Sequence, residues 1–237
     1  MHAPYGLNVL DTCLTCPGRE EHLFCNPSTH AGQRLNEIKS TAVYPKGAML
    51  FIEGQQPRGV FVLCVGKAKL STSSHKGKTI ITKIAGPGDV FGLNAVMSNR
   101  PSEVTVEMME TGSVNFIPRD SLMRFLKHDS EVILHVAEEL SRNYYSAHDE
   151  IRTLGLTASL SERLAKLLLS WSANPVRDDG STQVKLRLTH EEIAESIGTS
   201  RQVLSRLMFE FKQKQLIQGN GTTFLIWNAA LEKIIQS

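Results

Sequence analysis

The sequence has no hydrophobic run that approaches the 18 residues of a membrane-spanning helix. The first residues, MHAPYGLNVLDTC, also lack the basic and apolar regions of a signal peptide. We therefore expect a cytoplasmic protein with no membrane partner. Because thiols stay reduced in that compartment, clustered cysteines there more often bind metals or react than form structural disulfides.

The sequence also lacks a clear excess of either charge, because the 237 residues carry a net charge of only +2. A surplus this small does not predict nucleic-acid binding by itself, so any basic surface must be local. Hydrophobic residues make up 41% and charged residues 21%, which is typical of a globular chain with one large or two small domains. The eight histidines and many acidic residues form no recognisable nucleophile–base or metal-hydrolase motif, so we do not expect an enzyme.

Cysteine is rare too, yet three of the four cysteines lie within 13 residues, at Cys13, Cys16 and Cys25. The fourth, Cys64, lies in a β-rich run, where it is either a small apolar residue or a ligand. Thiolates suit both zinc and iron–sulfur clusters, and a Cys-x-x-Cys pair can also switch between thiols and a disulfide without a metal. The cysteines are therefore the candidate sensor or metal site.

Short β-rich runs fill the part of the chain from Thr41 to about Pro118. Glycines separate them at short intervals, and this pattern predicts a barrel or a sandwich. The runs that we expect to be strands are residues 48–52, 60–65, 67–70, 79–84, 104–108 and 114–117.

From Arg119 the hydrophobic period becomes helical. Seven residues are spaced alternately by four and three, as in the seam of a coiled coil, and polar residues flank them. This stripe packs either on its own domain or on a partner helix, and the strict alternation favours a dimer seam. The seam consists of Ile133, Ala137, Leu140, Tyr144, Ala147, Ile151 and Leu154.

The last third of the sequence predicts a winged helix-turn-helix. A helix over residues 159–171 and a short strand over 184–188 come first. Thr189 and Glu192 then have the spacing of a capping box, Gly198 ends the helix that they begin, and Ser200 caps the next one. Residues 216–227 follow as a hairpin with a Gly-Asn-Gly turn, which is the expected wing.

The exposed side of the second of these helices is the candidate DNA-reading surface. Arginine suits the O6 and N7 atoms of guanine and glutamine suits the N6 and N7 atoms of adenine, while a helix N-terminus favours phosphate. The candidate DNA-binding residues are Ser200, Arg201, Gln202, Ser205 and Arg206.

Over residues 41–237 the sequence resembles the CRP/FNR family of bacterial transcription regulators. The resemblance rests on Gly86-Pro-Gly-Asp-Val-Phe-Gly92 and on Gly198-Thr-Ser-Arg-Gln-Val-Leu-Ser-Arg206. It implies an α+β fold with a β-roll (jelly-roll) sensor domain like those that bind cyclic nucleotides, a long dimerisation helix and a C-terminal winged helix. It also implies a homodimer that binds palindromic double-stranded DNA and contacts RNA polymerase. The predicted divisions are a Cys-bearing segment (1–38), the β-roll (39–118), the dimerisation helix (119–155) and the winged-helix domain (156–237).

The positions at which the family binds a cyclic nucleotide are changed in this sequence. The resemblance implies a glutamate for the ribose where Leu93 stands, and an arginine for the phosphate where Pro101 stands, beside Arg100 and Ser102. Burying an anionic phosphate without its arginine is unfavourable. We therefore do not expect a cyclic nucleotide, although another small ligand in the β-roll stays possible.

The cysteines resemble those of the oxygen-sensing FNR branch, in which an N-terminal cluster and one distant cysteine hold a [4Fe–4S] cluster. Cys13, Cys16 and Cys25 match the N-terminal set, although their second spacing is longer. Asn115 occupies the place of the distant cysteine, so Cys64 is the leading fourth ligand. The non-cysteine alternatives are Asp11, His22 and His30.

The main hypothesis is a homodimeric DNA-binding regulator that senses redox state, oxygen or nitric oxide through this cluster. The family implies that gain or loss of the cluster changes the dimer packing and hence the spacing of the two reading helices. Two other roles of the cysteines are alternatives to the cluster: a switch between thiols and a disulfide ranks second, and a structural zinc site ranks third. A ligand-binding module without regulatory DNA binding is the competing class.

Overall fold

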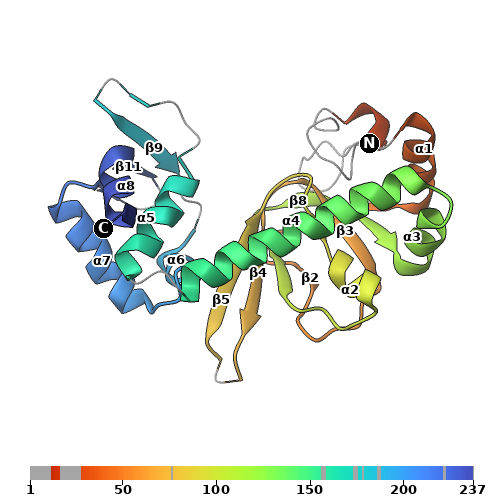
Figure 1. Ribbon diagram of the computed structural model, residues 1–237, viewed down its shortest axis with the longest axis horizontal. Coiled ribbons are helices and arrows are strands. Elements are labelled where there is room, and N and C mark those ends of the chain that lie inside the picture. Colours follow the sequence, from red (N-terminus) through yellow and green to blue (C-terminus); the bar gives the residue numbers. More distant parts are fainter. Residues whose placement is uncertain are drawn as a thin grey trace. The chain divides into compact units, whose positions relative to one another are not determined.

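The computed structural model describes residues 12–16, 28–75, 77–155, 159–172, 176–177, 179–185, 188–220 and 223–236. The chain divides into two compact units, a first one of residues 1–76 and 82–146 and a second one of residues 77–81 and 147–237 (Figure 1). A 26-residue helix, α4 (Ser130–Gly155), belongs to both. No helix in the described part is long and apolar enough to cross a membrane.

The first unit is built on two four-stranded sheets. One has the strand order β1 (Ser40–Tyr44), β8 (Gly112–Pro118), β3 (Gly59–Val65) and β6 (Val90–Phe91). The other has the order β2 (Met49–Phe51), β7 (Thr105–Met108), β4 (Ala68–Ser73) and β5 (Thr79–Ala85). These sheets form the expected β-roll, and each of the six predicted runs overlaps a strand, although three of them extend one residue beyond it at one or both ends. Among the strands and α-helices described in this unit, β1, β6, α1 (Thr29–Ile38) and α2 (Leu93–Ser98) were not expected from the sequence.

Alternation along β3 explains why the roll has two cores. Leu63 belongs to a cluster drawn from both sheets, which also includes Val106 and Val114. Val60 and Val62 lie on the other side of the strand and belong to a second cluster with residues of α1, α3 (Arg119–Leu126) and α4. Because successive strand residues point to opposite faces, one strand serves both cores.

Two helices occupy residues 119–155, where the sequence suggested one. α3 ends at Leu126 and α4 begins at Ser130, after a turn closed by a hydrogen bond from the His128 amide to the Phe125 carbonyl. Asp129 lies in this turn, and its carboxylate is 2.8 Å from the Arg34 guanidinium of α1. This ion pair therefore links the turn before α4 to α1.

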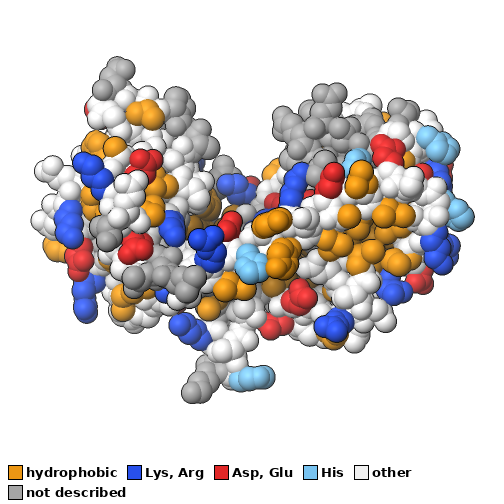
Figure 2. Space-filling model, viewed as in Figure 1, with side chains coloured by type: hydrophobic (Ala, Val, Ile, Leu, Met, Phe, Trp, Pro, Cys, Tyr) orange, Lys and Arg blue, Asp and Glu red, His pale blue; other side chains and the backbone are white. Residues whose placement is uncertain are grey.

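The long helix α4 has two distinct faces. Val132, Val136 and Glu139 are buried against the first unit. Ile133 and Tyr144 lie about a quarter-turn away around the helix and are 48% and 61% exposed. Figure 2, drawn in the same view as Figure 1, shows hydrophobic side chains along the line of α4.

The second unit is a three-stranded sheet with helices. It contains α5 (Leu160–Ser170), β9 (Ser181–Lys185), α6 (His190–Ser196), α7 (Arg201–Gln213), β10 (Ile217–Asn220), β11 (Thr223–Trp227) and α8 (Asn228–Gln236), with the strand order β10-β11-β9.

Two details of the second unit correct the sequence predictions. The strand expected at 184–188 begins earlier, at Ser181, because Asp179 Oδ1 accepts hydrogen bonds from the Ser181 amide and hydroxyl and so ends the preceding turn. The hairpin turn is also displaced, because Gly219 and Asn220 lie in β10 and pair with Phe224 and Thr223. The connecting residues 221–222 lie outside the described part of the chain.

Candidate nucleic-acid interface, dimer face and thiol cluster

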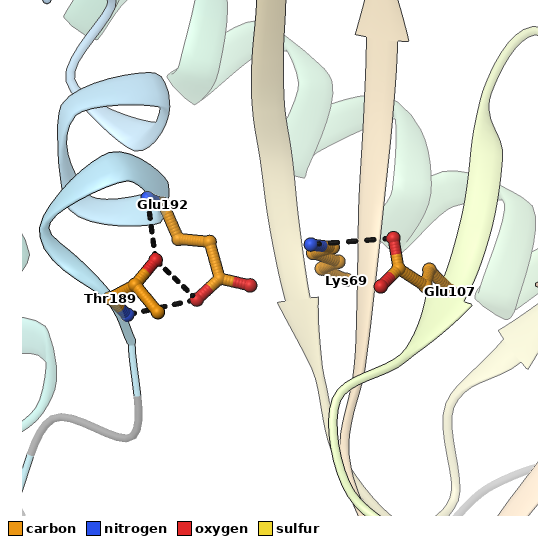
Figure 3. A network of polar contacts seen from close by, with 4 residues as sticks. All are labelled: Lys69, Glu107, Thr189 and Glu192. Atoms are coloured by element: carbon orange, nitrogen blue, oxygen red, sulfur yellow. Dashed lines mark hydrogen bonds and ion pairs between the residues drawn. The ribbon is translucent and has the colours of Figure 1, made fainter. Parts of the chain in front are cut away.

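The helix-turn-helix is formed by α6 and α7. The predicted capping box is confirmed: Thr189 Oγ1 accepts from the Glu192 amide at 3.2 Å, and Glu192 Oε2 accepts from the Thr189 amide at 2.9 Å (Figure 3). Gly198 has φ = +72°, a left-handed conformation that favours glycine and turns the chain after α6. Ser200 Oγ then accepts from the Val203 amide at 3.4 Å and begins α7. Figure 3 also shows the ion pair between Lys69 of β4 and Glu107 of β7, 3.3 Å apart.

Burial divides α7 into a core side and a solvent side. Leu204, Leu207, Met208 and Phe211 are buried, and Ala194 of α6 is fully buried, as expected where two helices cross closely. The predicted base-facing residues Arg201, Gln202, Ser205 and Arg206, with the cap Ser200, are all exposed. Among the described residues, neither arginine has a carboxylate partner, so both are available to an external acceptor.

The α4 stripe predicted as a dimer seam is exposed over most of its length. Ile133, Ala137, Tyr144, Ala147 and Ile151 are exposed, so no part of the chain that the structure describes covers them. Leu140 differs, because it is half-buried and packs against the core of the first unit. The Leu154 side chain lies outside the described part. Within the described residues, these five positions therefore do not follow the alternative in which the stripe is covered by its own domain.

Cys13 lies against the first sheet. It begins a short 3-10 helix, η2 (Cys13–Thr15), and its amide donates to Asn36 Oδ1 of α1 at 3.3 Å. The side-chain amide of Asn115, on β8, donates to Cys13 Sγ at 3.4 Å. Asn115 is held in turn by Thr41 Oγ1, which donates to Asn115 Oδ1 at 2.7 Å. The residue at the place of the family's distant cysteine thus contacts a cysteine sulfur.

Cys64 is the extra residue of a β-bulge, where the pairing of β3 with β8 shifts between Leu63 and Val65. Its thiol donates to the Val62 carbonyl at 3.6 Å. The pKa of this thiol is raised to about 11, chiefly by burial and also by the neighbouring Cys13 and Cys16, although the Asn115 backbone amide and the Lys39 ammonium act to lower it. The structure therefore brings Cys64 close to both other described cysteines.

The described part of the predicted metal site is incomplete. Cys13, Cys16 and Cys64 form no disulfide, and within the described ranges no three His, Cys, Asp or Glu side chains are grouped to hold a metal ion. Cys25, Asp11 and His22 lie outside the described residues, and His30 is exposed on α1. The sequence did not indicate Lys39, Thr41 or Asn36 at this site, because their contribution depends on how β1 and α1 pack.

The positions associated with a cyclic nucleotide have an unusual environment. Leu93 is only 1% exposed and belongs to the helix-side core. Arg100 and Pro101 are exposed, and Ser102 is buried. A cavity of about 370 Å³ lies nearby in the first unit, and its walls include Tyr44, Phe51, Arg58, Phe61, Ser102 and Phe116. A small ligand in the β-roll stays a prediction, and so does the expectation that this ligand is not a cyclic nucleotide.

Two protein families match separate parts of the chain. The cyclic nucleotide-binding domain matches residues 41–129, and the Crp-like helix-turn-helix domain matches residues 162–234. The CRP-like cAMP-activated global transcriptional regulator of Mycobacterium tuberculosis is 24% identical over 184 residues, covering 77% of this chain and 82% of that protein. The transcriptional regulator SdrP of Thermus thermophilus is 23% identical over 207 residues, covering 86% and 98%.

Solved structures share the fold. FixK2 from Bradyrhizobium japonicum matches with a TM-score of 0.69 and 21% identity, over 83% of this chain and 96% of that one. The c-di-GMP-responsive global regulator CLP of Xanthomonas campestris matches with a TM-score of 0.74 and 18% identity, over 84% and 99%.

Proposed function

Because this chain belongs to the CRP/FNR family of transcription regulators, we propose that it binds a palindromic DNA site as a homodimer and takes its signal through its N-terminal cysteines. The chain is a DNA-binding regulator of the CRP type, and the family consists of transcription regulators, whose members work as dimers. RNA polymerase is the further partner that this membership implies. The palindrome, the seam residues and the signal are the parts that we propose.

The observation that carries DNA reading is the exposed side of α7. Arg201, Gln202, Ser205 and Arg206 share this side, opposite the buried leucines that fix the helix in its unit. Arginine and glutamine form bidentate hydrogen bonds with guanine and adenine in the major groove. Ser205 Oγ donates to the Arg201 carbonyl at 2.9 Å, which keeps the Ser205 side chain against α7 between the two arginines.

Selection from a random DNA library tests this function. The expected product is a palindrome whose half-sites are about one helical turn apart. Arg206→Ala should relax the preference at one base pair of each half-site by about 1–3 kcal/mol. Recovery of no enriched sequence by the full-length protein would favour a ligand-binding module instead.

The observation that carries thiol sensing is the double contact of Asn115. Its side chain donates to Cys13 Sγ at 3.4 Å, and its backbone amide lies near enough to the Cys64 thiol to lower the pKa of that thiol. One residue of β8 thereby joins a thiol from the N-terminal segment to a thiol in the β-roll. A change in the bonding of either sulfur must alter the contacts of the N-terminal segment with this sheet.

A [4Fe–4S] cluster is the cofactor that we propose for these cysteines, with Cys13, Cys16, Cys25 and Cys64 as its ligands. When bound, such a cluster would supply one-electron redox chemistry, and oxygen or nitric oxide could disrupt the cluster itself. Thiolates are its usual ligands, so the donor type fits. The geometry within the described residues does not complete the set, because Cys64 points its thiol at Val62 and Cys25 is not among them.

The competing form of the switch is a disulfide. Two thiols and one molecule of hydrogen peroxide give one disulfide and two molecules of water, and an organic hydroperoxide gives one water and one alcohol instead, so no metal is required. The proximity of Cys13 and Cys64 supports this alternative.

Metal and sulfide analysis after anaerobic purification distinguishes the two forms. A cluster predicts bound iron and sulfide and visible absorption that bleaches in air, all lost in Cys64→Ala and retained in Val65→Ala, an exposed neighbour on β3. A disulfide predicts iron-free protein in which peroxide joins two cysteines, seen by mass spectrometry. Iron-free protein whose thiols resist peroxide would remove redox sensing from the proposal.

The path from the thiols to the dimer face runs through α1. Asn36 of α1 accepts from the Cys13 amide, and Arg34 pairs with Asp129 beside the start of α4. At the N-terminal end of α1, the Ser28 amide donates to Glu131 Oε1 at 2.9 Å, one helical turn or less from Ile133. We propose that a change at Cys13 shifts α1 and thereby the first turn of α4.

A further inference from the structure

Phe209 is an aromatic residue on the solvent side of α7 whose position the DNA-reading prediction did not include. Its side chain is 61% exposed, although phenylalanine is usually among the more buried residues. The core of the unit is filled from the same helix by Phe211, which is 2% exposed. Phe209 is therefore not a displaced core residue.

The helical period places Phe209 among the base-facing residues. With about 100° of rotation per residue, Gln202, Arg206 and Phe209 lie within an arc of about 60°. The buried residues Leu204 and Phe211 lie on the opposite side of the helix. When α7 enters the major groove with Gln202 and Arg206 toward the base edges, Phe209 faces the same way.

The chemistry of the major groove offers one apolar group to such a side chain. The base edges present hydrogen-bond donors and acceptors, and thymine alone adds a C5-methyl group. A phenyl ring can make no hydrogen bond with the edges and gains only from contact with that methyl. We infer that Phe209 reads a thymine in each half-site through its C5-methyl group; this rests on the proposed DNA-binding function.

The position of the thymine follows from the helix rise. Phe209 lies about 4.5 Å along the axis from Arg206 and about 10.5 Å from Gln202, at 1.5 Å per residue. The thymine therefore neighbours the base pair that Arg206 reads, on the side away from the one that Gln202 reads. A sequence requirement for thymine at that place, and not at the opposite flank, is the expected pattern.

Replacing single thymines by deoxyuridine tests the inference, because this exchange removes only the methyl group. When deoxyuridine replaces the thymine that Phe209 reads in the selected palindrome, the full-length protein should bind about four-fold more weakly for each half-site that is changed, because one buried methyl group is lost. Phe209→Ala should bind the thymine and deoxyuridine sites equally. Glu210→Ala, a change at the exposed neighbour outside the arc, should keep the full difference.

Circular dichroism and thermal unfolding check that Phe209→Ala keeps its fold, which we expect because the side chain is mostly exposed. Equal binding of all deoxyuridine sites by the unmodified protein overturns the inference, and so does a methyl preference that survives Phe209→Ala. Failure to select any DNA sequence overturns the proposed DNA-binding function itself. These outcomes differ, so the two claims fail separately.

Discussion

Replacing Ile151 by alanine should weaken the dimer without disturbing the monomer. Full burial of an isoleucine side chain stabilises by about 1.5–3 kcal/mol. Ile151 is 65% exposed in the single chain, so burial against a partner helix adds roughly 1–2 kcal/mol per protomer. The symmetric dimer has two such residues, and their loss predicts a dissociation constant raised by about 30-fold or more. Alanine is also the better helix former, so α4 itself should persist.

Sedimentation equilibrium over a range of concentrations measures this effect directly. Leu134→Ala provides the matched control, because Leu134 is an aliphatic residue of α4 with a similar exposure of 60%. It lies about 100° around the helix from Ile133 and therefore outside the seam. If Leu134→Ala weakens the dimer as much as Ile151→Ala, or if Ile151→Ala leaves it unchanged, the assignment of the seam is wrong.

Four further outcomes are expected. Thr189→Val removes the hydroxyl that caps α6 and should lower the free energy of unfolding by about 1 kcal/mol in chemical denaturation. Gly59→Ala places a methyl group against the Ile117 carbonyl and the Phe116 ring and should lower the melting temperature, with a cost of about 1–3 kcal/mol. Burial raises the pKa of the Glu139 carboxyl above its ordinary value of 4.5. The stability of the folded protein should therefore fall as the pH rises through this value, because the folded state keeps a proton that the unfolded state releases. In Glu139→Gln this fall should be absent, so the melting temperature of the variant relative to the unmodified protein should increase from acidic to neutral pH. Cyclic AMP should leave the melting temperature unchanged, since Leu93 is buried where the family places a ribose-binding glutamate, and a clear increase would contradict this.

Local sequence patterns predicted much of the fold because they depend on neighbouring residues. The capping box at Thr189 and the cap at Ser200 require only side chains three positions away, and both are present. The six expected strands follow from short β-branched runs between glycines. By contrast, β6 has only two residues, and no local pattern signals so short a strand. α1 does have local signals, the cap at Ser28 and the helical spacing of Ala31, Leu35 and Ile38, and these were not recognised in the sequence.

The candidate sites divide in the same way. The exposed side of α7 follows from helical periodicity, and the burial pattern agrees with it. The surroundings of Cys64 could not be predicted, because they depend on a β-bulge that brings it beside Asn115 of another strand. The sequence marked Asn115 only as a missing ligand, whereas in the structure its amide contacts a sulfur.

The polar contacts that link α1 and its cap to the start of α4 are of a strength that suits a switch. Coupling between a signal site and a functional surface typically amounts to about 1–3 kcal/mol. The Arg34–Asp129 pair is partly exposed, with side-chain exposures of 34% and 12%, so solvent screens it and it contributes about 1 kcal/mol at most. The Ser28–Glu131 hydrogen bond is exposed and adds a similar amount. The proposed switch therefore requires these polar contacts to exchange when Cys13 changes its bonding, while the buried core that Ala31 and Leu35 of α1 share with Val132 and Val136 of α4 stays intact.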